Sequence, residues 1–185
     1  PPLPRKAGPV GYGFGVEAAI MDESGALLPH GSVGEVVVRG PNVVDGYENN
    51  PEANAQAFVN GWFRTGDQGV IDADGYLKLT GRLKELINRG GEKISPLEID
   101  DVLLRHPAVA EAVAFAAPHP TLGEEVHAAV VLRAPVSERE LREHCAAALA
   151  EFKVPRVFHV LDEIPRGATG KLQRINMARL LGLST

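Results

Sequence analysis

The sequence predicts an α+β protein in two parts, a β-rich segment over residues 1–82 and a small α+β domain over residues 83–185. The first part holds short runs of β-branched residues separated by Gly- and Asp-containing turns, which are typical of antiparallel strands. The second part alternates helix-start signals with strand-like runs. The chain of 185 residues is 44% hydrophobic, which is ordinary for a globular protein. Such segregated strands and helices indicate the α+β class.

The first part begins its regular structure with a strand over residues 16–21 and a second over residues 35–39, where three valines stand together. The segment "NNPEANAQAF" predicts a short helix with Pro51 at its first position, where a missing N–H costs nothing. Farther on, "GVIDADGYLKLTG" predicts a hairpin that turns at Asp74-Gly75.

The second part contains two helix starts of the same kind. "SPLEIDDVLLRHP" predicts a capping box between Ser95 and Glu98, with Pro96 at the first helical position. "SERELREHCAAALAEF" predicts a second capping box between Ser137 and Glu140, followed by a buried stripe.

Strands are expected between and after these helices. "AVAEAVAFAAP" and "EEVHAAVVLRA" alternate as strands do, and "VPRVFHVL" predicts a third. A terminal helix is expected near residues 175–181. The boundary between the two parts is placed within "TGRLKEL", residues 80–86.

Composition narrows the function classes. A net charge of −5 gives no reason to expect nucleic acid as a partner. The single cysteine, Cys145, rules out an internal disulfide framework and suits a reducing, cytoplasmic location. No spacing of His and Cys suggests a metal site, so none is predicted in this chain. No apolar run approaches the length of a membrane span.

A Gly-Lys pair in "IPRGATGKLQR" raises the possibility of a phosphate-binding loop. The P-loop pattern fails here, because Pro165 replaces its first glycine and Leu172 replaces the hydroxyl residue that holds Mg²⁺. What remains is a small-residue loop that presents Lys171. On its own, such a loop is more often a surface turn than a functional site.

Three polar clusters in order make the prediction specific. "WFRTGD" fits the pattern aromatic-[RK]-T-G-D, and "GRLKELINRGGEKISPLEID" fits a G-R-x-[DK] hinge pattern that ends in E-[IV]-[DE]. "IPRGATGKLQR" fits P-[RK]-x-x-x-G-K-[ILV]-x-R. In this order they resemble the closing motifs of the adenylate-forming superfamily, which includes acyl-CoA synthetases, carrier-loading adenylation domains and firefly-type luciferases. Within it, "INRGGEKISPLEID" and "AEFKVPRVFHV" look most like oxalate–CoA ligase-type acyl-CoA synthetases.

The resemblance implies a two-step reaction with ATP, Mg²⁺ and coenzyme A. A carboxylic acid substrate attacks the α-phosphate of ATP to give an acyl-adenylate and pyrophosphate, and a cation is needed because two anions approach each other. Lys171 matches the family's catalytic lysine. Asp67 matches the carboxylate that accepts from the ribose hydroxyls, and Arg82 an arginine beside the ribose and phosphate. Lys84 occupies the family's hinge position, about which the small lid domain rotates between the steps.

The second step, in which the CoA thiol displaces AMP, implies a further set of residues. Gly90 and Gly91 match a hairpin that lines the pantetheine tunnel, where glycine permits close approach of the backbone. Phe152, Lys153 and Arg156 stand where related ligases meet the nucleotide end of CoA.

Two departures from the family pattern also bear on the prediction. The Gly/Ser/Thr-rich phosphate loop and the aromatic-G-x-T-E motif do not occur in the chain, which opens on "PPLPRKAGPVGYG". We therefore expect the C-terminal portion of a longer enzyme whose large N-terminal domain is its partner, and no activity from this portion alone. A carrier-loading adenylation domain, or a non-catalytic lid or interaction module, stays open as an alternative.

Overall fold

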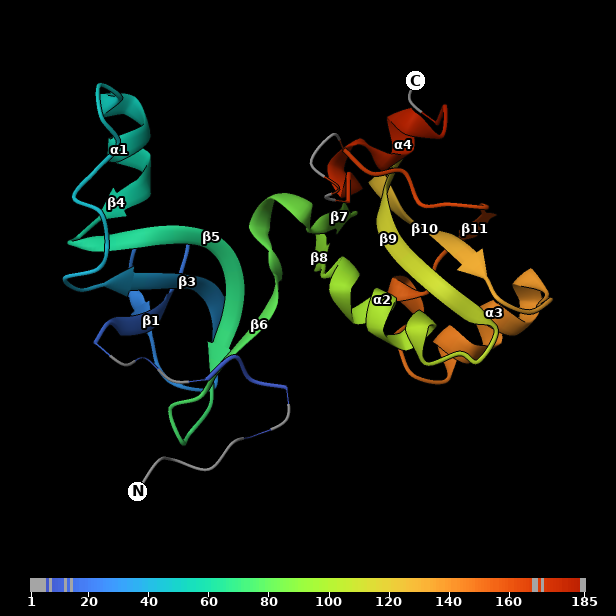
Figure 1. Cartoon of the computed structure of the whole chain (residues 1–185), viewed down its shortest axis with the longest axis horizontal. Coiled ribbons are helices and arrows are strands. Elements are labelled where there is room, and N and C mark those ends of the chain that lie inside the picture. The colour runs from blue at the N-terminus through green and yellow to red at the C-terminus, as the bar shows by residue number, and fades with distance from the viewer. Residues whose placement is uncertain are drawn as a thin grey trace. The chain divides into compact units, whose positions relative to one another are not determined.

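The computed structural model describes residues 6, 8–11, 13, 15–167, 170 and 172–183. The chain divides into two compact units, a first unit Pro1–Leu83 and a second unit Lys84–Thr185 (Figure 1). Each unit has its own hydrophobic core.

The first unit is an antiparallel sheet with one short helix. Its strands follow the order β2-β1-β3-β5-β4, and β6 also pairs with β5, along a different stretch from β4. The elements are β1 (Glu17–Met21), β2 (Leu27–Leu28), β3 (Val33–Arg39), α1 (Pro51–Ala57), β4 (Phe58–Val59), β5 (Trp62–Ile71) and β6 (Leu77–Arg82).

Local sequence signals explain the turns of this unit. Asp72 Oδ1 accepts hydrogen bonds from the backbone N–H groups of Asp74 and Tyr76, both at 2.9 Å, which closes the turn from β5 into β6. Asn50 caps α1 by accepting from the N–H of Ala53 at 3.1 Å. The hairpin at Asp74-Gly75 and the helix that starts at Pro51 are therefore confirmed.

Side chains on alternate positions bury both faces of this sheet. Ile20, Val36 and Ile71 pack together, and Met21, Val37 and Trp62 form a separate cluster. Because successive strand residues point to opposite faces, neighbours such as Ile20 and Met21 serve different clusters. The sheet thus holds β5 and β6 rigidly side by side.

The second unit is a mixed sheet covered by helices. Its strands follow the order β11-β10-β7-β8, and β9 also pairs with β10 in antiparallel orientation. Among the strands that pair with β10, β11 is the parallel one. The elements are β7 (Ile87–Arg89), β8 (Glu92–Ile94), α2 (Pro96–Leu104), β9 (Val109–His119), β10 (Gly123–Leu132), α3 (Glu138–Ala146), β11 (Val157–Val160) and α4 (Met177–Leu180). Short 3₁₀ turns occupy Leu83–Glu85, Glu151–Lys153 and Arg174–Asn176.

The core of the second unit lies on both faces of β9 and β10. Val126, Ala128 and Val130 pack with residues of α2 and α3 on one face. Ala129 and Phe115 lie on the other face, in the cluster that contains Met177 of α4. Figure 1 shows α2 and α3 beside this sheet and α4 at the other side of β9. The predicted α+β class is confirmed.

The two predicted capping boxes have different outcomes. Ser137 and Glu140 form a complete box at the start of α3, with each side chain bonded to the backbone of the other. Ser95 is the N-cap of α2 but makes no side-chain capping bond, so the first box is wrong. The carboxylate of Glu98 instead pairs with Lys153 at 2.7 Å.

Candidate functional site

The bulge that carries Asp67 interrupts the pairing of β3 with β5. Val37 pairs with Arg64 and Glu35 with Gln68, so Thr65, Gly66 and Asp67 together face the single residue between Val37 and Glu35. Two extra residues on one strand must leave the sheet plane. Gly66 makes this possible with a φ of 73°, a value in the left-handed region.

Asp67 and Arg82 lie side by side at the end of this bulge. They are register partners across β5 and β6, and Arg82 Nε is 2.9 Å from Asp67 Oδ1. The Arg82 side chain is 66% exposed and that of Asp67 is 23% exposed. An ion pair this open contributes about 1 kcal/mol or less to stability, so Arg82 can exchange its partner for a ligand phosphate at little cost.

This pair fits a nucleotide chemically. A carboxylate accepts several hydrogen bonds, so Asp67 can accept from sugar hydroxyls as well as from Arg82. The neighbouring guanidinium can donate to a phosphate in the same ligand. The structure brings together the two residues that the sequence predicted for nucleotide binding.

Lys84, the predicted hinge residue, is exposed in the 3₁₀ turn Leu83–Glu85 and is the first residue of the second unit. Lys171, the predicted catalytic residue, lies outside the described residues. Its sequence neighbours Gly170 and Leu172 are described, and Leu172 forms an isolated bridge with Arg166.

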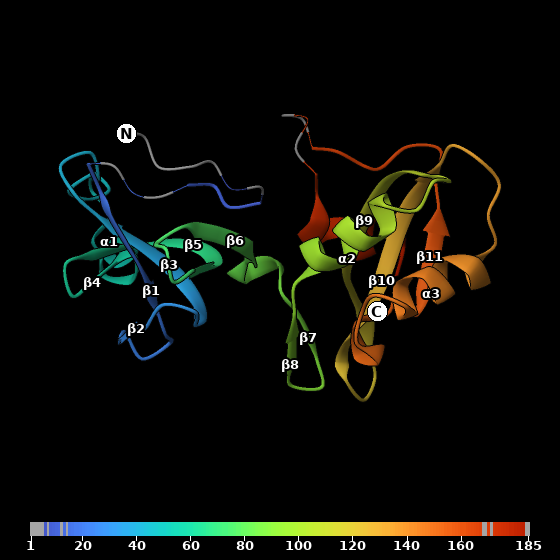
Figure 2. The ribbon, with the colours of Figure 1, turned by 90° about the horizontal axis from the view of Figure 1, so that it is seen from below.

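The Gly90-Gly91 pair forms the tip of the β7–β8 hairpin, which Figure 2 shows projecting from the second unit. Arg89 pairs with Glu92, so these two glycines are the whole loop, with φ values of 60° and 100°. Positive φ at both positions is the geometry of a tight type I′ hairpin. A side chain at Gly90 would meet Leu122 at 3.1 Å, whereas Gly91 has open space around it.

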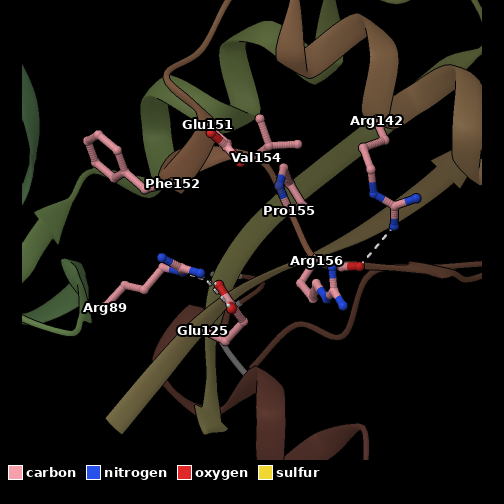
Figure 3. Close-up of a pocket in the computed structure, with 8 residues that line it drawn as sticks. All are labelled: Arg89, Glu125, Arg142, Glu151, Phe152, Val154, Pro155 and Arg156. Atoms are coloured by element: carbon pink, nitrogen blue, oxygen red, sulfur yellow. Dashed lines mark hydrogen bonds and ion pairs between the residues drawn. The ribbon is translucent and has the colours of Figure 1, made fainter. Parts of the chain in front are cut away.

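A pocket of about 500 Å³ opens in the second unit beside this hairpin (Figure 3). Its lining comes from β7, β10, α3 and the segment that leads into β11. The lining residues are Arg89, Glu125, Arg142, Glu151, Phe152, Val154, Pro155 and Arg156. Phe152 and Arg156 were predicted from the sequence, and the fold brings both to this pocket.

The arginines of the pocket differ in how far they are already neutralised. Arg89 donates to both oxygens of the buried Glu125, at 2.6 and 3.2 Å. Arg142 pairs with Glu138 and also donates to the carbonyl of Arg156 at 2.9 Å. Arg156 is exposed, and its guanidinium has no ion-pair or hydrogen-bond partner among the described residues.

Glu125 stays charged beneath the pocket. Burial alone would raise the pKa of its carboxyl, but the Arg89 guanidinium and the Val126 N–H hold that pKa below its ordinary value. The charges of Arg89 and Glu125 therefore neutralise each other at the base of the pocket. The charge that remains available for a ligand phosphate is that of Arg156, assisted by Arg142.

Lys153 takes a different position from the one its motif suggested. Its ammonium pairs with Glu98 of α2 and lies 5.8 Å from the centre of the Phe152 ring, and Lys153 is absent from the pocket lining. Arg89 and Arg142 line the pocket but were not predicted as site residues from the sequence. Arg89 directly precedes Gly90 in the hairpin motif, which was a usable signal, but Arg142 carried none because its position depends on how α3 packs.

Similarity to known proteins extends over most of the chain. Residues 98–171 match the family described as AMP-binding enzyme C-terminal domain. Oxalate–CoA ligase from Arabidopsis thaliana is 52% identical over 173 residues, which cover 92% of this chain and 34% of that protein. The chain matches the C-terminal portion of adenylate-forming, AMP-binding enzymes. The resemblance that the motifs indicated is confirmed.

Solved structures of CoA synthetases agree with the fold. The o-succinylbenzoate–CoA synthetase of Bacillus subtilis, in complex with its acyl-adenylate intermediate, superposes with a TM-score of 0.85 at 44% identity and covers 91% of this chain. The same synthetase in complex with ATP and a magnesium ion gives a TM-score of 0.83. The chain spans about a third of the length of these relatives, 34% to 35%.

Two further observations concern metals and membranes. Within the described ranges no group of three or more His, Cys, Asp or Glu side chains is placed to hold a metal ion. Over the same part of the chain no helix combines the length and apolarity that crossing a membrane requires.

Proposed function

We propose that this chain is the C-terminal portion of an acid–CoA ligase. The enzyme would join a carboxylic acid to coenzyme A in two steps, with ATP converted to AMP and pyrophosphate. Residues 1–82 would be the β-rich end of the large AMP-binding domain, and residues 83–185 the small mobile domain. The cytoplasm remains the proposed location, since the one cysteine is an unpaired buried thiol.

In the first step a carboxylate oxygen of the acid attacks the α-phosphorus of ATP, and the bond to pyrophosphate breaks. Asp67 would accept hydrogen bonds from the ribose hydroxyls, and Arg82 would donate to the phosphate. Lys171 would place its ammonium beside the reacting oxygens, where a fixed cation stabilises the charge that develops. Mg²⁺, when bound by the rest of the enzyme, supplies further neutralisation of the phosphate charge.

In the second step the thiol sulfur of CoA attacks the acyl carbon, loses its proton and displaces AMP. Arg156 would bind a phosphate at the nucleotide end of CoA, with Arg142 beside it and the Phe152 ring available for the adenine. Gly90 and Gly91 would border the pantetheine. The small domain would turn about Lys84 between the steps. Lys153, which Glu98 already holds, stays a predicted contact.

The observation that carries the choice of CoA is the unneutralised guanidinium of Arg156 in a pocket that also contains an aromatic ring. An arginine that has no partner in a concave site is better explained by binding of an anionic ligand than by a role in stabilising the fold. The 3′-phosphate of CoA is such an anion, and a carrier protein presents no equivalent of it.

The test compares CoA with dephospho-CoA in the complete ligase that contains this chain. Arg156→Ala should raise the KM for CoA about ten- to hundredfold, the effect of one lost charged hydrogen bond, with dephospho-CoA little affected. ATP–pyrophosphate exchange should be unchanged. The matched control is Arg139→Ala on α3, whose side chain is 82% exposed and outside the pocket.

The alternatives give different results in the same assay. A wild-type enzyme that exchanges pyrophosphate but makes no thioester with CoA would indicate a carrier-loading enzyme. A complete protein without pyrophosphate exchange on any carboxylic acid would indicate a non-catalytic module. If Arg156→Ala raised the KM for CoA and the KM for dephospho-CoA equally, Arg156 would not contact the 3′-phosphate.

A further inference from the structure

Glu35 of β3 is a buried carboxylate directly under the bulge that carries Asp67. Its side chain is only 6% exposed. Glutamate is seldom this buried unless it is paired, so its contacts need an explanation. None of the motifs in the sequence includes it.

Among the described residues, the side chain of Glu35 makes its polar contacts with Arg64 and Gly66. Its Oε2 accepts from Arg64 Nε at 2.6 Å and lies 2.5 Å from Arg64 Nη2. Its Oε1 accepts from the backbone N–H of Gly66 at 3.0 Å. Glu35 therefore holds Arg64, the residue just before the bulge, and Gly66 at its turn.

The bond to Gly66 replaces a bond that the sheet cannot make. Bulged residues lose their ladder partners, and a backbone N–H left without a partner is costly. Glu35 supplies that partner with a charged oxygen, which makes the bond stronger than an ordinary one.

The remainder of the bulge is fixed by a second chain of bonds. Thr65 Oγ1 donates to the carbonyl of Val36 at 2.7 Å and accepts from the N–H of Asp67 at 3.1 Å. Arg64, Thr65 and Gly66 are thus bonded to the segment Glu35–Val36, and Asp67 is bonded to it through Thr65. The position of the Asp67 carboxylate follows from these anchors.

We propose that Glu35 is a positioning residue for nucleotide binding. It fixes the shape of the bulge so that Asp67 meets the ribose hydroxyls with its carboxylate already oriented. Preorganised acceptors bind more tightly because no ordering cost is paid when the ligand arrives. This inference rests on the proposed function, in which Asp67 reads the ribose.

The test measures ribose recognition in the complete ligase. ATP–pyrophosphate exchange gives the KM for ATP and the KM for 3′-deoxy-ATP. The KM for 3′-deoxy-ATP divided by the KM for ATP is the ratio that reports the hydroxyl contact, and it is above one when the contact is made. Asp67→Asn is the reference and should bring the ratio close to one. Glu35→Ala should raise the KM for ATP about tenfold and lower the ratio in the same way, with the KM for the carboxylic acid unchanged.

Two further variants separate positioning from general stability. Glu35→Gln keeps an acceptor for the Gly66 N–H but loses the charge, so it should lower the ratio by a smaller factor. Glu17→Gln removes a carboxylate of the same sheet that pairs with Arg39 at 2.6 Å, away from the bulge, and should leave the ratio as in the wild type. The double variant Glu35→Ala with Asp67→Asn should lose no more than Asp67→Asn alone, because both act through one contact.

The outcomes distinguish the nucleotide-binding role of Asp67 from the positioning role of Glu35. If Asp67→Asn leaves the ratio unchanged, the proposed nucleotide role of Asp67 fails. If Asp67→Asn changes the ratio and folded Glu35 variants do not, only the positioning role is overturned. Should Glu35→Ala fail to fold, a folded Glu35→Gln with the wild-type ratio overturns the proposal equally.

Discussion

Arg174 and Asp100 form a buried ion pair in the second unit, with Arg174 Nη2 2.7 Å from Asp100 Oδ2. These are the last residues of the lysine motif and of the hinge motif. Arg174 also donates to the carbonyl of Ala114 at 2.5 Å and to Glu85 at 3.0 Å. A single guanidinium therefore ties α2, β9 and the 3₁₀ turn that contains Lys84 to the segment following Lys171.

Removing this guanidinium should destabilise the second unit strongly. Arg174→Met leaves the buried Asp100 without its partner, and such a loss costs about 3–5 kcal/mol. Denaturant unfolding of the whole chain, followed by circular dichroism, gives the free energy of unfolding. The fluorescence of Trp62, the sole tryptophan, reports the first unit and should not change. The exposed Arg179→Met on α4 is the control, and a similar loss there would mean that the ion pair is unimportant.

Lys171 should be needed for one half-reaction only. In the complete ligase, Lys171→Ala should slow adenylation by about 10²–10³-fold, the scale for one preorganised charge contact. Thioester formation from a supplied acyl-adenylate should be nearly intact. Lys78→Ala, an exposed lysine of β6, should alter neither rate. Equal losses in both steps after Lys171→Ala would show that the lysine is structural or serves both.

Lys84→Pro should separate the two half-reactions in the opposite sense. Proline fixes φ near −65° and removes an N–H, so a hinge residue replaced by proline can adopt fewer conformations. We expect ATP–pyrophosphate exchange to persist and CoA-dependent release of AMP to be lost. Lys84→Ala keeps the backbone free and should retain both. A folded proline variant with both rates unchanged would leave Lys84 an ordinary surface lysine.

Cys145 should be unreactive while the chain is folded. Its side chain is fully buried, and this burial raises the pKa of the thiol to about 11. The reactive thiolate is scarce at pH 8, so modification by a disulfide reagent should be slower than in the unfolded chain by about two orders of magnitude. The comparison with protein in guanidinium chloride is the control. Rapid reaction of the folded chain would show that the core opens around α3.

His127 and His159 should make the second unit less stable in mild acid. His127 Nδ1 lies 3.1 Å from His159 Nε2, so one ring must accept and is neutral. Burial lowers the pKa of both rings, and their mutual repulsion adds to it at His127, against a smaller opposing effect of Glu125 there and of Glu138 at His159. The folded chain then binds fewer protons than the unfolded chain below about pH 6.5.

Stability should therefore be full above about pH 6.5, fall as the pH drops from there toward the lowered pKa values of the folded state, and level off below them. Urea unfolding at a series of pH values measures this slope. The double variant His127→Gln with His159→Gln should flatten it, whereas His30→Gln in the first unit should not. An unchanged slope in the double variant would assign the acid sensitivity to other groups.

The sequence by itself determined the features that depend on neighbouring residues. The turn at Asp74-Gly75, the helix that begins at Pro51 and the capping box of Ser137 all formed as predicted. Each is closed by bonds between residues at most a few positions apart, so the local pattern already contains every partner. The ordered motifs likewise identified the superfamily, because they retain the residue types that its chemistry needs.

The tertiary structure decided whatever depends on partners distant in sequence. Glu98 pairs with Lys153, 55 residues away. Ser95 makes no capping bond at the start of α2, and Lys153 lies outside the pocket lining. Arg142 reaches the pocket because α3 packs beside β11, and Glu35 reaches Gly66 because β3 pairs with β5. A charged side chain takes whichever partner the packed chain brings within reach, and local spacing contains no record of that choice.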